Sequence, residues 1–557
     1  MRKTVLLLCA VMLTAATAAA ERVRVDTQQE FDLLAKDIEA AVKGGARIVE
    51  VEIGQGTFYF RNRHIALSRK QWEEVALIIR GDNTIIEPAD EALRDTVPPA
   101  PLKQTDRLIE VADESQKLCR LHLEDPRPLT DRGQEPTHIT ITQWFKSLTY
   151  KVERISGGWV YFKADDLSYN TYYKCHNINL DYGYSLKKDG KGIMPRYRME
   201  SAAANSGTAC RLLSMDNCTF ASVEISSITF RGNKDSASDY LIYINNSHAD
   251  SIAFKECDFL GIRSGVILAQ GSSNVRVSAC RFRACHRAGI LANYCEATVV
   301  SDNSFDNMGL ACNNNYCIRV SGKDYYVARN RITDFGYGGI AAGTWWKTEK
   351  RTVERGVVEY NTLSYSAPYF QNIAERGLMD SGAIYLYTQN DDVKVRYNFI
   401  HDYTGLCDNR GIFCDDGACH FELYGNIILN TPNGYSIDSR YTPSIAKDPQ
   451  SKTRTINTGN RIYDNIIDGN LRFEGTPAGS ESVSPSGGCS LGNNIVLTLG
   501  SKHPAANVLN NLSRQRAFIS APYIGIDKGK VVVPAATMRR ISDLDSAKPM
   551  LEHFQMR

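Results

Sequence analysis

Short stretches of alternating apolar and polar residues cover most of this chain, and one phrase keeps returning between about residues 218 and 496. An Asn or Cys stands two positions before an apolar residue, as in Cys257-Asp258-Phe259 and Asn330-Arg331-Ile332. The first intervals between phrases are 23, 23 and 27 residues, and later ones are 28–39 residues. The phrases begin at Cys257, Cys280, Asn303, Asn330, Asn361, Asn398, Asn426, Asn465 and Asn494. This pattern predicts a repeated coil with loops inserted into it.

A second phrase, a Gly followed by alternating apolar residues, comes eight or nine residues after the first, at Gly265, Gly289, Gly339 and Gly434. Each repeat therefore holds two short β-like arms, which can bury their apolar faces only if neighbouring coils stack. Neither a dense Leu pattern nor a helical period is present, and 23 residues are too few for the four strands of a propeller blade. The sequence predicts an all-β fold, a right-handed parallel β-helix (solenoid).

The first part of the chain predicts a cap for this solenoid. Thr27 suits a helix N-cap, and apolar residues follow it at helical spacing. They are Phe31, Leu34, Ile38 and Val42. A helix here would cover the open end of the coil and hide its strand edges. Residues 48–53, 54–60 and 77–81 read as the opening strands.

The repeat stops between about residues 96 and 200, where Pro and aromatic residues are common and residues 139–142, 150–152 and 157–162 have strand patterns. We interpret this segment as a small β module inserted into the solenoid. The expected organisation is a signal peptide at 1–20, the cap and first strands at 21–95, the inserted module at 96–200, the repeats at 201–500, and C-terminal strands and a tail at 501–557.

Composition narrows the classes of function. Lys and Arg number 65 and Asp and Glu 63, a net charge of +2, which gives no global field for nucleic acid or an anionic membrane. Residues 1–20 carry two basic residues, an apolar run from Val5 to Leu13 and small residues before Glu21, as in a secretory signal. We expect an exported, periplasmic or extracellular monomer with no membrane span, no nucleic-acid partner and no cofactor.

Two residue types of the repeat have structural interpretations. The Asn residues of the first phrase are expected to form an internal amide ladder that satisfies turn backbones. Cys257 and Cys280 share that repeat position, so we expect them to stack as small buried hydrophobic residues. Other cysteines could form disulfides, because the compartments that receive exported proteins are oxidising. Local pairs are possible between Cys312 and Cys317, or among Cys407, Cys414 and Cys419.

Long insertions mark the expected functional face, because loops on a repeat scaffold build binding sites. The longest intervals between repeat phrases begin at Asn330, Asn361 and Asn426, so we expect the site within residues 330–440. Aromatic faces carry sugar rings and polar groups read hydroxyls. The candidate substrate-binding residues are Trp345, Trp346, Glu375, Arg376, Tyr385, Tyr387, Arg410, Asp438 and Arg440. The candidate catalytic residues are Asp380, Asp415, Asp416, His401 and Asp402.

The carboxylates suit glycosidic cleavage, which needs one carboxylic acid to protonate the leaving oxygen and one carboxylate as base or nucleophile. Three phrases carry them, at residues 380–385, 398–402 and 411–417: Asp-x-Gly-Ala-Ile-Tyr, Asn-x-Ile-His-Asp and Gly-Ile-x-x-Asp-Asp-Gly. With the opening strands and the inserted module, these phrases resemble β-helix carbohydrate-active enzymes, most of all glycoside hydrolases of family 141. The resemblance implies a secreted hydrolase of plant or host polysaccharides or oligosaccharides. It also implies that Asp380 and one of Asp415 and Asp416 are its catalytic pair.

Stacking of Gly382 on Gly411 would place Asp380 and Asp415 roughly 20 Å apart on a straight strand. Either a bend shortens that distance, or the pair includes Asp402, Asp438 or Glu375. Two other functions remain open. A polysaccharide lyase or epimerase would act on uronate-containing glycans through Arg, Lys or His, and a glycan-binding β-helix would need no convergent carboxylates.

Overall fold

The structure is a computed structural model, and its description is confined to the following residues: 20–68, 72–94, 96, 103–104, 109–113, 115–123, 136–143, 146–163, 196–200, 210–236, 238–311, 315–343, 353–365, 381–386, 389–403, 409–415, 418–429, 431, 435–439, 460–467, 470–473, 490–491, 494–497, 518–521, 525–527 and 530–532.

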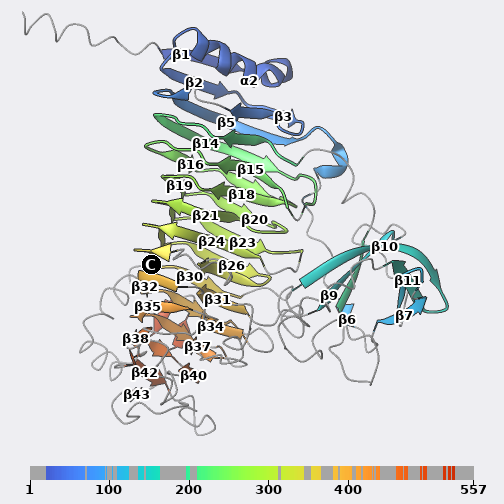
Figure 1. The fold of residues 1–557 in the computed structure, drawn as a ribbon, viewed down its shortest axis with the longest axis vertical. Coiled ribbons are helices and arrows are strands. Elements are labelled where there is room, and N and C mark those ends of the chain that lie inside the picture. The colour runs from blue at the N-terminus through green and yellow to red at the C-terminus, as the bar shows by residue number, and fades with distance from the viewer. Residues whose placement is uncertain are drawn as a thin grey trace, which may run out of the picture.

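The main body is a solenoid of parallel strands (Figure 1). Each complete coil contributes one strand to each of three stacked rows. The first strand row contains β4 (Ile65–Ser68), β13 (Leu213–Asp216), β15 (Tyr240–Asn245), β18 (Gly265–Gln270), β21 (Ile290–Glu296), β24 (Tyr316–Lys323), β27 (Gly338–Ala342), β31 (Ser381–Leu386), β34 (Asn409–Cys414), β37 (Tyr435–Ser439) and β40 (Asn470–Phe473).

The second and third rows share two long strands, β5 (Ala76–Pro88) and β14 (Ser222–Arg231). The second row further contains β1 (Ala20–Val25), β2 (Ile48–Ile53), β16 (Ile252–Lys255), β19 (Val275–Ser278), β22 (Val299–Ser301), β25 (Tyr326–Ala328), β29 (Val357–Glu359), β32 (Gln389–Arg396), β35 (Cys419–Tyr424), β38 (Arg461–Tyr463) and β41 (Ser490–Leu491). The third contains β3 (Gly56–Phe60), β17 (Asp258–Leu260), β20 (Arg281–Arg283), β23 (Ser304–Met308), β26 (Arg331–Phe335), β30 (Thr362–Ser364), β33 (Phe399–His401), β36 (Ile427–Leu429), β39 (Ile466–Ile467), β42 (Asn494–Leu497) and β43 (Phe518–Ala521). The predicted right-handed parallel β-helix is confirmed.

Among the described residues, some short elements lie outside these rows. Strand β28 (Val353–Glu354) pairs with β24 and β32, and β44 (Gly525–Asp527) forms an antiparallel hairpin with β45 (Lys530–Val532). A single 3-10 turn, η2 (Glu91–Leu93), follows β5. None of the helices in the described part of the chain is both long enough and apolar enough to span a membrane.

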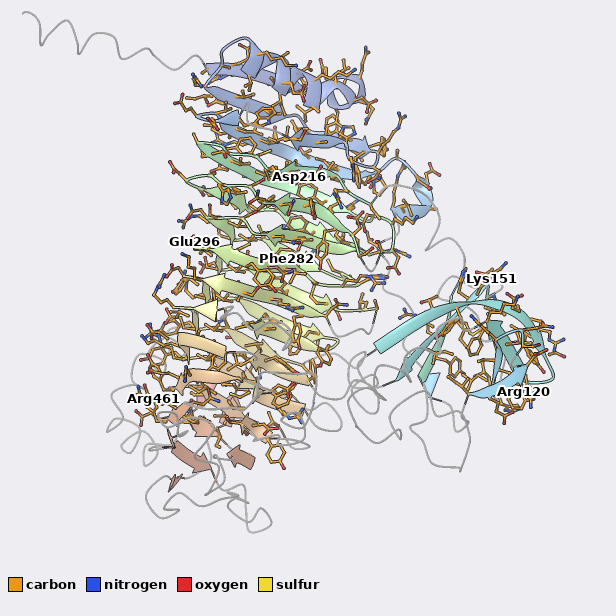
Figure 2. The ribbon with its side chains drawn as sticks, viewed as in Figure 1. Arg120, Lys151, Asp216, Phe282, Glu296 and Arg461 are labelled. Atoms are coloured by element: carbon orange, nitrogen blue, oxygen red, sulfur yellow. The ribbon has the colours of Figure 1, made fainter. Side chains whose placement is uncertain are left out.

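The interior is filled by columns of identical or similar side chains, because parallel register places equivalent residues of successive coils on top of one another. Phe230, Phe259, Phe282 and Phe305 stack with ring centroids 5.0, 4.8 and 4.5 Å apart. Figure 2 shows Phe282 within the solenoid. The column continues in register with Ile332 and Leu363. Offset stacking of aromatic rings adds to the free energy gained from burying their apolar area.

Helix α2 (Gln28–Lys43) lies at the N-terminal end of the solenoid (Figure 1). The predicted N-cap is confirmed: the Thr27 side chain accepts from the Glu30 N–H, and the Glu30 carboxylate accepts from the Thr27 N–H. This capping box satisfies two backbone donors that a helix start leaves open. Phe31, Leu34 and Ile38 are fully buried, so the apolar face of α2 closes the end of the core.

A second, separate core belongs to the inserted segment. Its strands form an antiparallel sheet in the order β6-β12-β9-β10-β11-β8-β7. They are β6 (Lys103–Gln104), β7 (Glu110–Asp113), β8 (Leu118–His122), β9 (His138–Gln143), β10 (Lys146–Ser156), β11 (Trp159–Lys163) and β12 (Arg196–Glu200). Ile139, Ile141 and Phe162 are among its buried residues. Figure 1 shows this module beside the solenoid.

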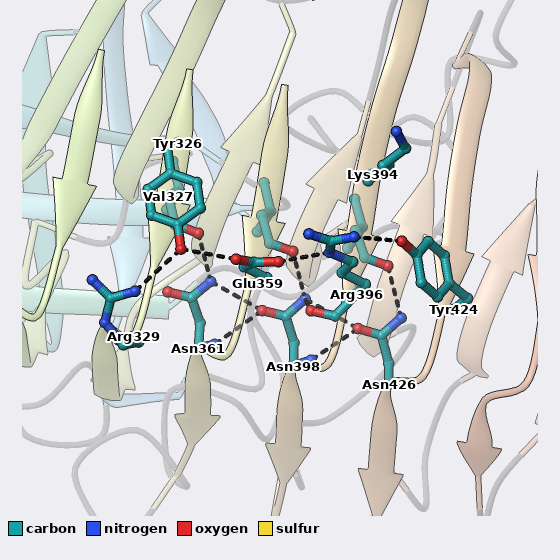
Figure 3. A network of polar contacts seen from close by, with 12 residues as sticks. Tyr326, Val327, Arg329, Glu359, Asn361, Lys394, Arg396, Asn398, Tyr424 and Asn426 are labelled. Carbon is teal, nitrogen blue, oxygen red and sulfur yellow. Dashed lines mark hydrogen bonds and ion pairs between the residues drawn. The ribbon is translucent and has the colours of Figure 1, made fainter. Parts of the chain in front are cut away.

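Six buried asparagines form a continuous amide ladder between the second and third rows, and Figure 3 shows three of them, Asn361, Asn398 and Asn426. Asn330 shows the pattern. Its Nδ2 donates to Asn361 Oδ1 at 2.9 Å and to the Val300 carbonyl at 2.9 Å, and its backbone N–H donates to the same Asn361 Oδ1 at 3.0 Å. The members are Asn303, Asn330, Asn361, Asn398, Asn426 and Asn465, each 0–2% exposed. The ladder predicted from the sequence is confirmed.

The cysteines of the repeat behave as predicted in one respect and not in another. Cys257 and Cys280 are buried free thiols, and the Cys280 backbone N–H donates to Asn303 Oδ1 at 2.9 Å, so they continue the Asn ladder as small residues. Cys317 is also a free, buried thiol, so the local disulfide considered between Cys312 and Cys317 is wrong. Cys414 is buried, and pairing among Cys407, Cys414 and Cys419 stays a prediction. Cys312 and Cys407 lie outside the described residues.

A charged network follows the outer side of the second row, next to the amide ladder (Figure 3). Glu359 accepts from Tyr326 Oη at 2.8 Å and from Arg396 Nε at 2.6 Å. Arg396 also donates to Tyr424 Oη at 2.7 Å. Because these groups come from four successive coils, each bond fixes the axial register from outside, as the asparagines do from inside.

Replacing Asn361 with Ala should destabilise the solenoid, because it removes the acceptor used by both the N–H and the Nδ2 of Asn330 and leaves the Val327 carbonyl without its amide donor. Buried groups left without a partner cost about 1–3 kcal/mol each, so we expect the free energy of unfolding to fall by about 2–4 kcal/mol. Urea titration followed by circular dichroism measures this loss. Asn293→Ala, at a half-buried position of β21, should change it by less than about 0.5 kcal/mol. Equal losses in both variants would contradict a structural role of the ladder.

Candidate active site

Residues that pair with one another across successive strands form a column, which we call a register column. One register column of the first strand row contains several of the predicted site residues. Arg319 pairs with Ala341, Ala341 with Tyr385, Tyr385 with Phe413, and Phe413 with Asp438. This column faces outward, since Arg319 is partly exposed whereas its chain neighbours Ile318 and Val320 belong to the core. Side chains alternate along a strand, so Asp415, two positions after Phe413, projects to the same side.

Tyr385 and Asp415 are in direct contact. Tyr385 Oη donates a hydrogen bond to Asp415 Oδ2, and the Asp415 N–H donates to the Leu386 carbonyl at 2.9 Å. Tyr385 is 7% exposed, whereas Asp415 is half-buried. The structure thus brings together one predicted catalytic carboxylate and one predicted substrate-binding aromatic residue, held by the pairing of β31 with β34.

The strand that carries Tyr385 bends sharply at its start. A Cβ on Gly382 would lie 2.9 Å from Phe413 Cβ, although Phe413 pairs with Tyr385, three positions further on. Only a bend can bring these positions so close, and glycine permits it because it has no Cβ. The predicted stacking of Gly382 on Gly411 is wrong, since Gly382 pairs with Arg410. Asp380 lies outside the described residues, so the shortening of its distance to Asp415 stays a prediction.

Arg410 and Asp438 form a completely buried ion pair. Arg410 Nε lies 2.5 Å from Asp438 Oδ2, and both side chains are 0% exposed. The guanidinium also lies over the Phe413 ring, with Cζ 3.8 Å from the centroid. Charges removed from water are retained only where a partner satisfies them. Arg410, Asp438 and Phe413 therefore form a fixed unit in the coils beside Tyr385, and the substrate-binding role of the two charged residues stays a prediction.

Aromatic rings surround Tyr385. Its centroid lies 5.0 Å from Phe413, 5.6 Å from Tyr316 and 6.4 Å from Tyr337, and the last two are 5.3 Å apart. A Cβ at Gly338 would come within 2.4 Å of the Tyr316 ring, so this position must stay glycine for the ring to lie there. All three tyrosines are buried, at 4–8% exposure, and they place ring faces and hydroxyl groups side by side, the two features that suit sugars.

His401 and Asp402 lie elsewhere. His401 ends β33 of the third row, its Nδ1 is 2.9 Å from Asp402 Oδ2, and its ring stacks on Phe399 at 4.5 Å. These two residues do not belong to the register column of Tyr385 and Phe413. The remaining predicted site residues lie outside the described residues, and their roles stay predictions: Asp380, Asp416, Trp345, Trp346, Glu375, Arg376, Tyr387 and Arg440.

Sequence reasoning missed Tyr316 and Tyr337 as members of the aromatic group. A Tyr between two glycines just before a predicted strand, Gly336-Tyr337-Gly338, was the available signal. It also missed Asp306, within β23 of the third row. Burial, together with the nearby Asp334 carboxylate, raises the pKa of Asp306. Tyr316 carried no signal, because only the register shows that it lies beside Tyr385.

Comparison with known proteins supports the fold and leaves the activity open. A model of the family NosD, periplasmic copper-binding protein, matches residues 213–348. A solved glycoside hydrolase is 11% identical, with a TM-score of 0.52, covering 75% of this chain and 96% of its own. A mutant tailspike protein of E. coli bacteriophage HK620 in complex with a pentasaccharide is 10% identical, with a TM-score of 0.37 and coverage of 89% and 75%.

A family 28 exopolygalacturonase of Yersinia enterocolitica is 11% identical, with a TM-score of 0.30 and coverage of 82% and 74%. No curated protein matches the sequence. At these identities the likeness concerns the parallel β-helix alone.

The description of the NosD family raises the question of whether this chain has a copper site. Soft Cys and Met side chains and the imidazole of His are the ligands that suit copper. Within the described ranges, no three or more His, Cys, Asp or Glu side chains are grouped so that they could hold a metal ion. The thiols of the matched segment, such as Cys257, Cys285 and Cys317, are buried, and burial raises the pKa of Cys285 to about 12. A buried neutral thiol is a poor ligand, because the thiolate is the form that binds metals. These residues do not fit a copper site.

Replacing Arg410 with Met should lower the free energy of unfolding by about 3–5 kcal/mol, because it leaves the Asp438 carboxylate buried without its cation. The matched control is Arg355→Met. Arg355 pairs with Asp324 at 2.7 Å on the surface, where its side chain is 54% exposed, and surface pairs contribute about 0–1 kcal/mol. Both variants are compared by urea unfolding. A loss below 1 kcal/mol for Arg410→Met would show that the pair does not hold the site together.

Proposed function

We propose that this chain is an exported glycoside hydrolase that cleaves a complex plant or host polysaccharide by acid/base catalysis with paired carboxylates. The observation that carries the proposal is the Tyr385–Asp415 hydrogen bond within an aromatic group on the outer face of the first strand row. A half-buried carboxylate beside tyrosine rings combines a proton-transfer group with a surface for a sugar ring.

Asp438 is the described carboxylate best placed to act with Asp415. Phe413 pairs with Asp438 on the adjacent strand, and Asp415 lies two residues beyond Phe413. One strand spacing and two residue steps give a backbone separation of about 8 Å on one face. Carboxyl groups about 6.5–9.5 Å apart leave room for the attacking water of an inverting enzyme. In this assignment Asp415 protonates the leaving oxygen, and the base is a second carboxylate, to be sought among Asp380, Asp416 and Asp438, of which Asp438 is buried in its ion pair with Arg410.

The resemblance to family 141 glycoside hydrolases adds Asp380 and Asp416 to the carboxylates that need testing. Export to the periplasm or the cell exterior follows from the expected signal peptide and agrees with the periplasmic description of the matched family. Polymeric glycans are found in those compartments, which supports the same substrate class.

The test is product analysis of the purified protein on plant and host polysaccharides and aryl glycosides, with single Asp→Asn variants at positions 380, 415, 416 and 438. Loss of the catalytic acid or base should lower kcat by about 10²-fold to 10⁴-fold, and Asp415→Asn should be one of the variants so affected. Asp392→Asn, which alters a surface carboxylate paired with Lys394 at 3.0 Å, should retain full activity.

New reducing ends that disappear in Asp415→Asn would establish the hydrolase. Circular dichroism shows whether each inactive variant is folded. Unsaturated, ultraviolet-absorbing products would assign a lyase instead, and full activity of folded Asp415→Asn would remove this residue from the mechanism. Binding without turnover on every substrate would leave a glycan-binding β-helix.

A further inference from the structure

Arginines gather at the N-terminal side of the candidate active site, on or beside the same face of the first strand row. Arg319 stands in the register column of Tyr385, two coils before it. Arg287 lies just before β21, and its Nε and Nη2 donate to Asp235 Oδ1 at 3.0 and 2.8 Å. Arg263, 3% exposed, lies one coil further toward the N-terminus.

The inserted module contributes a fourth arginine. Arg198 of β12 is 6% exposed, and its Nη1 donates to the Leu310 carbonyl of the solenoid at 3.2 Å. The module therefore contacts the solenoid beside this face and delivers a cation there. We call Arg198, Arg263, Arg287 and Arg319 the arginine group.

These guanidiniums influence the pKa values of two nearby side chains. Burial lowers the pKa of His286 well below its ordinary value, and Arg263, Arg198 and Arg287 lower it further, so this imidazole stays neutral among cations. Burial raises the pKa of Tyr240 to about 12, an effect that Arg319 and Arg287 oppose. Geometry gives the same grouping: Leu310, which accepts from Arg198, precedes Ala311, whose N–H donates to the His286 carbonyl at 2.9 Å, and Leu291, four residues after Arg287, pairs with Arg319.

The same neighbourhood contains aromatic rings, of which Tyr316 is buried and Tyr240 partly exposed. A Cβ on Gly265 would come within 2.1 Å of Tyr240 Cε1, so the Tyr240 ring lies over the next coil. Tyr316 lies over Gly338 in the same manner, and it belongs to the aromatic group around Tyr385. Rings and guanidiniums together suit a sugar that carries an anionic substituent. The rings pack against the apolar side of the sugar, while arginine recognises carboxylate and sulfate oxygens through its planar fork of donors.

Spacing connects this neighbourhood to the candidate catalytic residues. Strand β24, which carries Arg319, is three strands from β34, which precedes Asp415. At about 4.8 Å per strand the separation along the axis is about 14 Å, which a few sugar units would span. A chain lying along the solenoid axis would reach both places at once.

We propose that the arginine group binds an anionic substituent, a carboxylate or a sulfate, of the glycan whose scissile bond lies at Tyr385 and Asp415. The preferred substrate class is therefore an acidic polysaccharide, and Arg319 determines that preference. This inference rests on the proposed site for its catalytic end, but the binding of acidic glycan does not require turnover.

The experiment measures equilibrium binding by affinity electrophoresis and calorimetry with folded Asp415→Asn protein, so that cleavage does not interfere. Polygalacturonate is compared with its carboxyl-reduced form, and dextran sulfate with dextran. These two arms distinguish carboxylate from sulfate recognition. We expect at least one acidic polymer to bind ten-fold or more tightly than its neutral counterpart.

Adding Arg319→Gln should weaken that binding ten-fold or more and change binding of the neutral polymer less than two-fold. Arg319→Lys should give an intermediate value, because it keeps the charge but loses the planar fork. Arg331→Gln, at an exposed position on β26 of the third row, is the matched control and should have no effect.

Equal binding of acidic and neutral forms in both arms, or unchanged binding in Arg319→Gln, would overturn the inference. A wild-type protein that binds the acidic polymer through Arg319 but cleaves nothing would refute the proposed hydrolase and retain the acidic-glycan site. Cleavage restricted to neutral polymers would support the proposed hydrolase and refute the acidic-glycan site.

Discussion

The amide ladder is the constraint on which the rest of this fold depends. From Asn303 to Asn426, the side-chain NH2 of each ladder asparagine donates to one carbonyl in the coil before it and to one asparagine in the coil after it. The residue just before each has a left-handed backbone, with φ of 61° at Asp302, 55° at Arg329 and Tyr360, and 56° at Tyr397. Such angles are costly for residues other than glycine. The buried amide bonds offset that cost, and they do so only if every coil repeats the same corner.

A fixed corner explains how coils of very different length can share one register. The chain between ladder asparagines varies from 27 to 39 residues, yet Asn303 to Asn465 bond in an unbroken series. Extra residues must therefore leave the coil at other corners and return without shifting the strands. Because the strands stay in register, Arg319, Tyr385, Phe413 and Asp438 reach one column although 119 residues separate the first from the last.

Features repeated in every coil were readable from the sequence, since each repeat gives the same signal again. The ladder asparagines and the stacked Cys257 and Cys280 belong to this class, whereas the N-cap at Thr27 occurs once and was readable from local helical spacing. The candidate site belongs to a different class of feature, because its contacts join residues that are not repeated from coil to coil. Gly382 pairs with Arg410 and not with Gly411, a shift of one position that the sequence did not reveal. The ion pair of Arg410 with Asp438 and the contact of Tyr316 with Tyr385 depend on that register in the same way.

The solenoid also explains why a site of this kind can be both precise and extended. Each coil contacts only its neighbours, so the position of Asp415 is set by β31 and β37 and not by the distant cap. A completely buried ion pair is tolerable in this setting because two adjacent strands hold Arg410 and Asp438 at 2.5 Å without relying on loops. The same one-strand step, repeated along the axis, spaces Arg319, Tyr385 and Asp438 as a linear series. This linear arrangement follows from the parallel register and the strand spacing, independent of any individual side-chain contact.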